Sequence, residues 1–149
     1  MIRLAKLSDL KIIMDNLIRT NSDTFSQEEI TTAEESISQL INQQRYYVSI
    51  RSGVIVGCAG FSEREDTTGV FVLNWIAVNP NITQKGIGTE LYNFVEKKVK
   101  ELGARMMILN AGSGEDNVLF YRKMGFTEVG RIPQCYGTHK DLIWYQKML

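Results

Sequence analysis

Apolar residues recur every three or four positions in three stretches of the chain, which is the spacing of one face of a helix. The first stretch follows Ser8, a predicted N-cap, and the second covers about Gln27 to Asn42. Residues 21–26 form a polar break between them. The third stretch begins at Ile87 and ends before Gly103, a natural C-terminal stop. The pattern therefore predicts three amphipathic helices, each with one stripe that faces the core.

Strand-forming residues fill much of the remaining chain. Residues 46–50 and 54–61 flank a tight turn and predict an antiparallel hairpin. Residues 70–78 are apolar on both faces, as expected of a central strand. Because a strand over 104–109 follows the long helix, we expect one parallel crossover. The other elements expected are a short strand at 2–4, a short helix at 115–124, and two final strands at 126–132 and 142–148.

Composition narrows the class of protein. The 149 residues contain no repeat or low-complexity linker, so we expect a single domain over residues 1–149 with a mixed α/β (α+β) fold. Seventeen basic residues balance seventeen acidic ones, which gives no electrostatic reason to expect a nucleic-acid or membrane partner. Two cysteines and one histidine, without ligand spacing, argue against a disulfide framework and against a metal site. Charged residues interrupt the N-terminal apolar run, so we expect no signal peptide and a cytoplasmic protein.

The stretch LNWIAVNPNITQKGIGTEL, residues 73–91, combines a strand, a polar loop and a glycine turn into a helix. Glycines there leave the first helical N–H groups unpaired, and such a helix N-terminus binds anions, most often phosphate. A dinucleotide fingerprint would need glycine where Leu91 stands, and a Walker loop would need Gly-Lys-Ser/Thr, which is absent. The plainer alternative is that Gly86 and Gly88 only permit a tight turn.

A second motif narrows this choice. Residues 117–126 read NVLFYRKMGF, so Tyr121 lies on a short helix that stops at Gly125 and Phe126. Together with IAV-loop-QKGIGTELY and the order of elements, this resembles the GCN5-related N-acetyltransferase (GNAT) family. The resemblance implies a mostly antiparallel sheet of about six to seven strands, with splayed central strands and about four flanking helices. It also implies acetyl-coenzyme A (acetyl-CoA) as co-substrate, with no metal.

The resemblance further assigns residues to the coenzyme. The pyrophosphate is expected on the backbone N–H groups of residues 84–89, and the pantetheine arm beside the strand that ends at residues 76–78. Asn117 is expected to face the coenzyme. The cofactor-binding set is thus Ile76, Ala77, Val78, Gln84, Lys85, Gly86, Ile87, Gly88, Thr89, Asn117 and Tyr121. Lys85 is equally well explained as a solvated loop residue.

Tyr121 matches the family tyrosine that protonates the leaving thiolate, and its alternative is an ordinary core tyrosine beside Phe120. The chain departs from the family pattern in three places. Thr83 stands where the loop pattern has Gln or Arg. Gly114 and Asn117 replace the Asn and Ala that usually precede the tyrosine. Residues 70–74 also lack the glutamate that serves some relatives as general base.

Several residues remain as candidates for the missing base. Asn74 and Asn110 are expected to orient a water molecule and are included with Tyr121 in the catalytic set. His139 is a further possibility. Glu63, Glu65 and Asp66 precede the central strand, although each is also typical of a solvated turn. Glu28, Glu29, Glu34 and Glu35 fall where relatives place the acceptor site, so they would favour a positively charged amine, or they simply form an exposed helix face.

The resulting hypothesis is direct transfer of an acetyl group to a primary amine, either a small molecule or a lysine or N-terminal amine of a peptide. The alternative is a non-catalytic sensor that binds acyl-coenzyme A on the same fold, which the missing base keeps open. An enzyme with a different phosphate ligand is a third reading, against which the Tyr121 motif argues. A homodimer is possible by analogy with the fold.

Overall fold

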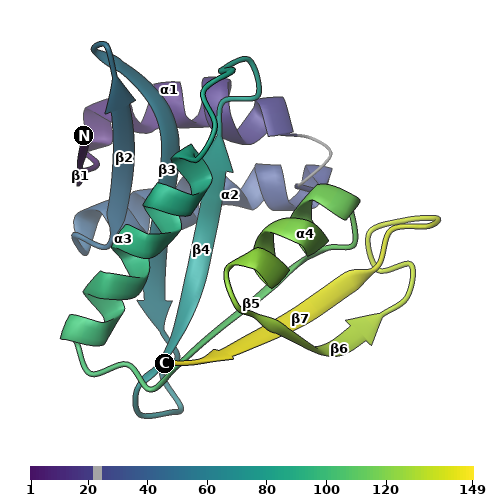
Figure 1. Ribbon diagram of the computed structural model, residues 1–149. Coiled ribbons are helices and arrows are strands. Elements are labelled where there is room, and N and C mark those ends of the chain that lie inside the picture. The colour runs from purple at the N-terminus through teal and green to yellow at the C-terminus, as the bar shows by residue number, and fades with distance from the viewer. Residues whose placement is uncertain (22–24) are drawn as a thin grey trace.

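The protein forms one seven-stranded sheet with helices on both faces (Figure 1), and the computed structural model describes residues 1–21 and 25–149. The strand order is β1-β2-β3-β4-β5-β7-β6. The strands are β1 (Ile2–Leu4), β2 (Tyr46–Arg51), β3 (Val54–Glu63), β4 (Val70–Val78), β5 (Met106–Gly112), β6 (Thr127–Ile132) and β7 (Leu142–Met148). The α-helices are α1 (Leu10–Ile13), α2 (Gln27–Asn42), α3 (Ile87–Glu101) and α4 (Glu115–Lys123).

The pairing of the strands confirms the predicted topology. The first four strands form an antiparallel meander, and β7 pairs antiparallel with both β5 and β6. The pair β4–β5 is parallel, and α3 connects the two strands. The mixed, mostly antiparallel class and the single crossover were therefore predicted correctly. The division into domains stays a prediction.

The two central strands separate along their length, as the family resemblance implied. β4 pairs with β5 only from Val70 to Val72, although it continues beside β3 as far as Val78. β5 meanwhile pairs with β7 as far as Gly112. Figure 1 shows β4 and β5 close together near the C-terminus and diverging away from it. Between the two free edges the backbone of β4 has no neighbouring strand, and this gap is where the site lies.

Two apolar cores cover the two faces of the sheet. α3 and α4 pack on one face around buried residues such as Leu91, Val95 and Tyr121, whereas α1 and α2 pack on the other around Ile13 and Ile37. The apolar stripes predicted for the second and third helices are buried, so amphipathic periodicity identified both core faces. None of the helices in the described ranges is long and apolar enough to cross a membrane.

The first helical segment differs from the prediction. Ser8 is not an N-cap, because the chain enters a 3₁₀ turn at Leu7–Asp9, where the Asp9 carboxylate accepts the backbone N–H of Lys6 (2.8 Å) and pairs with Arg3 (2.8 Å). α1 then passes into a π-helical turn at Met14–Ile18. Of the predicted polar break, residues 22–24 lie outside the described residues. Its last residue, Ser26, caps α2 by accepting the N–H of Glu29.

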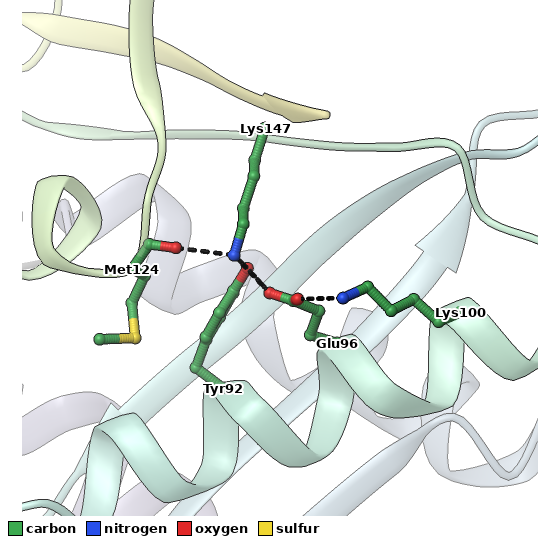
Figure 2. A network of polar contacts seen from close by, with 5 residues as sticks. All are labelled: Tyr92, Glu96, Lys100, Met124 and Lys147. Atoms are coloured by element: carbon green, nitrogen blue, oxygen red, sulfur yellow. Dashed lines mark hydrogen bonds and ion pairs between the residues drawn. The ribbon is translucent and has the colours of Figure 1, made fainter. Parts of the chain in front are cut away.

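A polar network fixes α3 to β7, and we call it the α3–β7 clamp: Tyr92, Glu96, Lys100, Lys147 and the carbonyl of Met124 (Figure 2). The Tyr92 hydroxyl donates to Glu96 Oε2 (2.5 Å), and Lys147 Nζ donates to the same oxygen (2.6 Å) and to Met124 O (2.8 Å). Lys100 Nζ donates to the other carboxylate oxygen (2.7 Å). Because Met124 follows the last turn of α4, the clamp also holds the end of the helix that carries Tyr121.

Candidate active site

A bulge in β4 shapes the gap between the central strands. Asn74 faces Gly60 of β3 and Ala77 faces Cys58, so Trp75 and Ile76 together oppose a single residue. Trp75 has a φ of 50°, a left-handed conformation that is rare for a bulky residue. Its carbonyl accepts the hydroxyl of the buried Tyr46 at 2.8 Å, which helps to hold the strained backbone. The bulge turns the last part of β4 away from β5.

Two clefts lie along the free edge of β4. The Val78 cleft is lined by Asn21, by Ile76 to Val78 of β4, by Gly88 of α3, and by Asp116, Asn117, Phe120 and Tyr121 of α4. The second cleft, the Trp75 cleft, adjoins the first at Ile76 and Tyr121. Its polar and aromatic lining consists of Phe25, Glu29, Ser36, Asn74, Trp75, Asn110 and Tyr121. Since Ile76 and Tyr121 line both clefts, a molecule in one cleft lies next to a molecule in the other at these two residues.

The glycine turn at the start of α3 has the geometry of an anion site. Gly86 is the N-cap in a left-handed conformation (φ 89°), and no side chain caps the helix there. A Cβ at Gly88 would lie 3.3 Å from the Phe120 ring and 3.6 Å from Val78, so glycine permits the close approach of α3 to α4 and β4. The first N–H groups of α3 thus remain available to a phosphate. Gln84 and Lys85 are exposed in the loop just before them.

The predicted coenzyme residues come together in space. Ile76, Ala77, Val78, Gly88, Asn117 and Tyr121 line the Val78 cleft. Gln84, Lys85 and Gly86 lie at the exposed start of α3, and Thr89 is half-exposed in its first turn. Ile87 has a buried side chain, so only its backbone N–H can contact a ligand. Asn117 donates its amide to the carbonyl of Gly112 (3.2 Å) and thereby ties α4 to the end of β5.

The free edge of β4 already has one polar partner. The Asn79 N–H donates to Val56 of β3, so by strand alternation the N–H and carbonyl of Val78 face the opposite edge. There the Val78 carbonyl accepts the side-chain amide of Asn21 at 3.0 Å. No local pattern indicates this contact, because Asn21 and Val78 are 57 positions apart.

Tyr121 is buried to 6% exposure between Phe120, Phe126 and Tyr145, as expected of a core tyrosine, and its catalytic role stays a prediction. Its ring packs in the core, while the side chain also lines both clefts. Its hydroxyl has no hydrogen-bond partner among the described residues. Burial above all, with the nearby Tyr145 and the charge of Glu29, raises the pKa of the Tyr121 hydroxyl. The phenol therefore stays protonated at neutral pH and can act as an acid.

The two asparagines predicted to be catalytic both line the Trp75 cleft. Asn74 is held in place, because its amide donates to the Ser62 hydroxyl (2.7 Å) and to the Val72 carbonyl (3.2 Å). Its Oδ1 is left to accept a hydrogen bond. Asn110 is exposed at the edge of β5 and pairs across the sheet with Trp144. Both positions suit the orientation of a water molecule or an amine.

The acidic candidates separate clearly in the structure. Glu63 and Glu65 line a different cleft, at the turn where β4 begins, and Asp66 there pairs with Arg64. His139 is exposed in the turn between β6 and β7 and lines neither of the two clefts described above. Of the four glutamates of α2, Glu28, Glu34 and Glu35 are exposed, whereas Glu29 is half-buried and lines the Trp75 cleft with Tyr121.

Glu29 was not singled out from the sequence. The only local signal was the spacing Ser26-x-x-Glu29, a capping box, which predicts a helix start rather than a site. In the part of the chain that the structure describes, no group of three acidic, histidine or cysteine side chains could hold a metal ion.

Comparisons with known proteins agree with this geometry. The sequence matches the family model described as "Acetyltransferase (GNAT) family" over residues 11–126. No curated protein sequence matches it significantly.

Similar folds occur among solved structures. A ribosomal-protein-alanine N-acetyltransferase from Brucella melitensis has a TM-score of 0.81 at 21% identity, with 100% of this chain and 99% of that chain covered. A Salmonella typhimurium protein solved with its cofactor acetyl-CoA has a TM-score of 0.80 at 19% identity, covering 100% and 93%. An aminoglycoside 6'-N-acetyltransferase from Enterococcus faecium has a TM-score of 0.73 at 20% identity, covering 99% and 96%.

At such low identities, the likeness to solved structures shows a shared fold. The family model spans most of the chain, including the glycine turn and the Tyr121 helix, and members of this family use acetyl-CoA. The uncapped start of α3 and the open edge of β4 fit a ligand with a pyrophosphate and an extended amide-containing arm. The chain belongs to the GNAT family of acetyltransferases.

Proposed function

We propose that the protein is an N-acetyltransferase that moves an acetyl group from acetyl-CoA to a primary amine by direct attack. The observation that carries the proposal is the position of Tyr121, a protonated phenol that lines both the Val78 cleft and the Trp75 cleft. A donor in the first cleft and an amine in the second would meet beside its hydroxyl. The lack of a carboxylate on residues 70–74 of β4 does not prevent the transfer, because polar side chains of other elements line the Trp75 cleft beside Tyr121.

In this proposal, the start of α3, the edge of β4 and α4 each contact a different part of acetyl-CoA. The N–H groups of Gly86 to Thr89 bind the pyrophosphate, with Lys85 and Gln84 beside them. The open edge of Ile76 to Val78 binds the amide groups of the arm, and Asn117 lies across from it. The Val78 N–H faces that edge and polarises a carbonyl placed there.

When bound, acetyl-CoA supplies a thioester whose carbonyl carbon accepts the amine. The Tyr121 hydroxyl then gives its proton to the departing sulfur. Its raised pKa keeps the phenol protonated until the thiolate charge develops beside it. Asn74 and Asn110 orient the amine or a water molecule from the acceptor side.

Thermal unfolding with acetyl-CoA, followed by detection of free thiol during a screen of amines, tests the proposal. We expect acetyl-CoA to raise the Tm and at least one amine to release thiol above the background of hydrolysis. Stabilisation by acetyl-CoA without thiol release from any amine would favour the acyl-coenzyme A sensor instead. No stabilisation by acetyl-CoA, with a shift by another nucleotide, would overturn both readings.

The acceptor is either a small molecule or a lysine or N-terminal amine of a peptide, and the screen includes each type. A cytoplasmic location and a homodimer stay predictions from the sequence.

A further inference from the structure

Glu29 occupies an unusual position among the charged residues of the protein. It is the third residue of α2, and its Oε1 accepts the backbone N–H of Ser26 at 3.0 Å, which completes the capping box. Its other oxygen, Oε2, accepts no hydrogen bond from the described residues. Because the side chain is half-buried and lines the Trp75 cleft, this second oxygen is available to a ligand in that cleft.

The charge of Glu29 acts on two tyrosines of other elements. Its negative charge contributes to the raised pKa of Tyr121 on α4, after the larger effects of burial and Tyr145. Burial first, and then the charge of Glu29, raise the pKa of Tyr136 to about 12, in the segment that joins β6 to β7. Both phenols are neutral at pH 7. Glu29 therefore lies near the proposed acid and gives the neighbourhood a negative charge.

Among the described residues that line the cleft, no cation balances that charge. The described residues that line it are apolar, aromatic or neutral and polar apart from Glu29 itself. A carboxylate that is half-buried without a counter-ion attracts an ammonium group. A ligand that also carries a carboxylate beside its amine would find no positive partner there, and burying such a group unpaired is costly.

The wall beside Glu29 is aromatic. The rings of Phe25 and Trp75 lie 5.4 Å apart at 51°, and the indole N–H of Trp75 donates to the Ser36 hydroxyl at 3.0 Å, which fixes the ring. Such a wall suits the apolar carbons that carry an amine, and ring faces also attract cations. The cleft thus offers an anion for the ammonium and apolar surface for the chain behind it.

We propose, building on the acetyltransferase function above, that Glu29 binds the acceptor ammonium and takes its proton, which selects a cationic alkylamine with no carboxylate beside the amine. The ammonium gives one proton to the Glu29 carboxylate and becomes a neutral amine. Its nitrogen bonds to the acetyl carbon, the carbon–sulfur bond breaks, and the sulfur takes the Tyr121 proton. The new amide nitrogen loses a second proton, which restores the Tyr121 hydroxyl, and Glu29 releases its own proton to water.

The capping box offers a matched set of variants. Glutamine serves at the third position of a capping box as well as glutamate does, so Glu29→Gln keeps the helix start and removes only the charge. Glu28→Gln removes the same charge from the same helical turn, but Glu28 is exposed and does not line the cleft. A difference between the two variants therefore reports on the cleft and not on α2.

The experiment measures thiol release by the wild type and both variants with pairs of an amine and its parent amino acid: tyramine with tyrosine, phenethylamine with phenylalanine, and agmatine with arginine. A peptide with a blocked N-terminus and one internal lysine distinguishes a protein acceptor from a small molecule. We expect each amine to exceed its amino acid by about 10- to 100-fold in kcat/KM, as an unpaired buried carboxylate implies.

We expect Glu29→Gln to lower kcat/KM about 100-fold, the effect of losing a general base, and Glu28→Gln to leave it unchanged. The deficit should shrink above about pH 10, where an alkylamine loses its own proton. The increase in Tm with acetyl-CoA should be the same in all three proteins. If Glu29→Gln matches Glu28→Gln, or if the amino acids are preferred, the assignment of Glu29 is overturned while the acetyltransferase remains. If no amine raises thiol release by the wild type above the hydrolysis seen without an acceptor, both proposals fall.

Discussion

The α3–β7 clamp and the cleft side of α4 are built from similar residues and differ in whether their polar groups are paired. In the clamp, the Tyr92 hydroxyl, both oxygens of Glu96 and the Lys147 ammonium all have partners in the folded chain (Figure 2). Near the clefts, the hydroxyls of Tyr121 and Tyr145 have no partner among the described residues. Paired polar groups stabilise a fold, whereas unpaired ones carry a cost that a ligand can remove.

The distribution of these groups follows the pairing of the sheet. The clamp joins α3 to β7, which pairs with β5 from Met106 to Gly112, whereas Tyr121 lines the clefts where β4 and β5 diverge. Lys147 of the clamp donates to the carbonyl of Met124 at the end of α4. The clamp therefore helps to position the helix that carries Tyr121. We infer that the paired network of the clamp helps to hold Tyr121 at the two clefts.

The largest expected effect tests Tyr121 at the two clefts. Tyr121→Phe should lower kcat by about 100- to 1,000-fold, because it removes the proposed proton donor. Stability in urea should stay within about 0.5 kcal/mol of the wild type, since the ring remains and the hydroxyl has no partner to lose. Steady-state kinetics and unfolding midpoints give the two values, and unchanged kcat would remove Tyr121 from the mechanism.

The next effect tests the α3–β7 clamp. Lys147→Met keeps much of the side-chain volume but leaves Lys100 as the only charged partner of Glu96, beside the Tyr92 hydroxyl, and leaves the Met124 carbonyl without its donor. We expect a loss of about 2–3 kcal/mol in the free energy of unfolding, below the figure for a fully buried pair because both side chains are partly exposed. Lys100→Met, at 52% side-chain exposure, should cost under about 1 kcal/mol. Equal losses in the two variants would contradict this ranking.

Two tyrosine substitutions compare the regions directly. Tyr92→Phe should lower stability by about 1–2 kcal/mol, because the hydroxyl donates to a carboxylate. Tyr145→Phe should be neutral or slightly stabilising, because it removes a buried hydroxyl with no partner. Urea unfolding of the two variants side by side measures the contrast, and a larger loss for Tyr145→Phe would reverse the interpretation.

The last prediction concerns the dependence of the clamp's stability on pH. Burial alone would raise the pKa of Glu96, but hydrogen bonds from Lys100, Lys147 and Tyr92 outweigh it and lower the pKa to about 2 from 4.5. Between these two values the unfolded state binds a proton that the folded state does not. Stability from Glu96 is therefore present above about pH 4.5 and is lost as the pH falls toward about 2. The free energy of unfolding, measured at several pH values in this range, should change less with pH for Lys147→Met than for the wild type.

Local patterns in the sequence were sufficient for much of the framework. The helix over Gln27–Asn42, the strand over Val70–Val78 and the helix that starts at Ile87 were predicted at their observed positions. Each has strong periodicity or a clear start or stop signal, which depends on neighbouring residues only. Ser8 failed as a cap because the first helical turn begins at Leu7 with Lys6 as its N-cap, and Asp9, held by Arg3, accepts the Lys6 N–H.

The site divides in the same way. The glycine turn and the Tyr121 motif were visible in the sequence, because both depend on residue types at fixed local spacing. The choice of Glu29 among four glutamates of one helix was not visible, because it depends on which residue of α2 the fold places at the cleft beside β4, β5 and Tyr121. The bulge at Trp75 and the contact of Asn21 with Val78 also require segments far apart in the chain.

The sequence by itself thus determined most of the elements, the family and the glycine turn, since local conformational preferences and short motifs specify these. The tertiary structure alone decided which polar groups are paired and which remain open. It placed Tyr92 in a closed network and left Tyr121 between two clefts, although both are buried tyrosines on amphipathic helices. The physical reason is that hydrogen-bond satisfaction depends on which distant groups the folded chain brings within about 3 Å, a quantity that no local pattern contains.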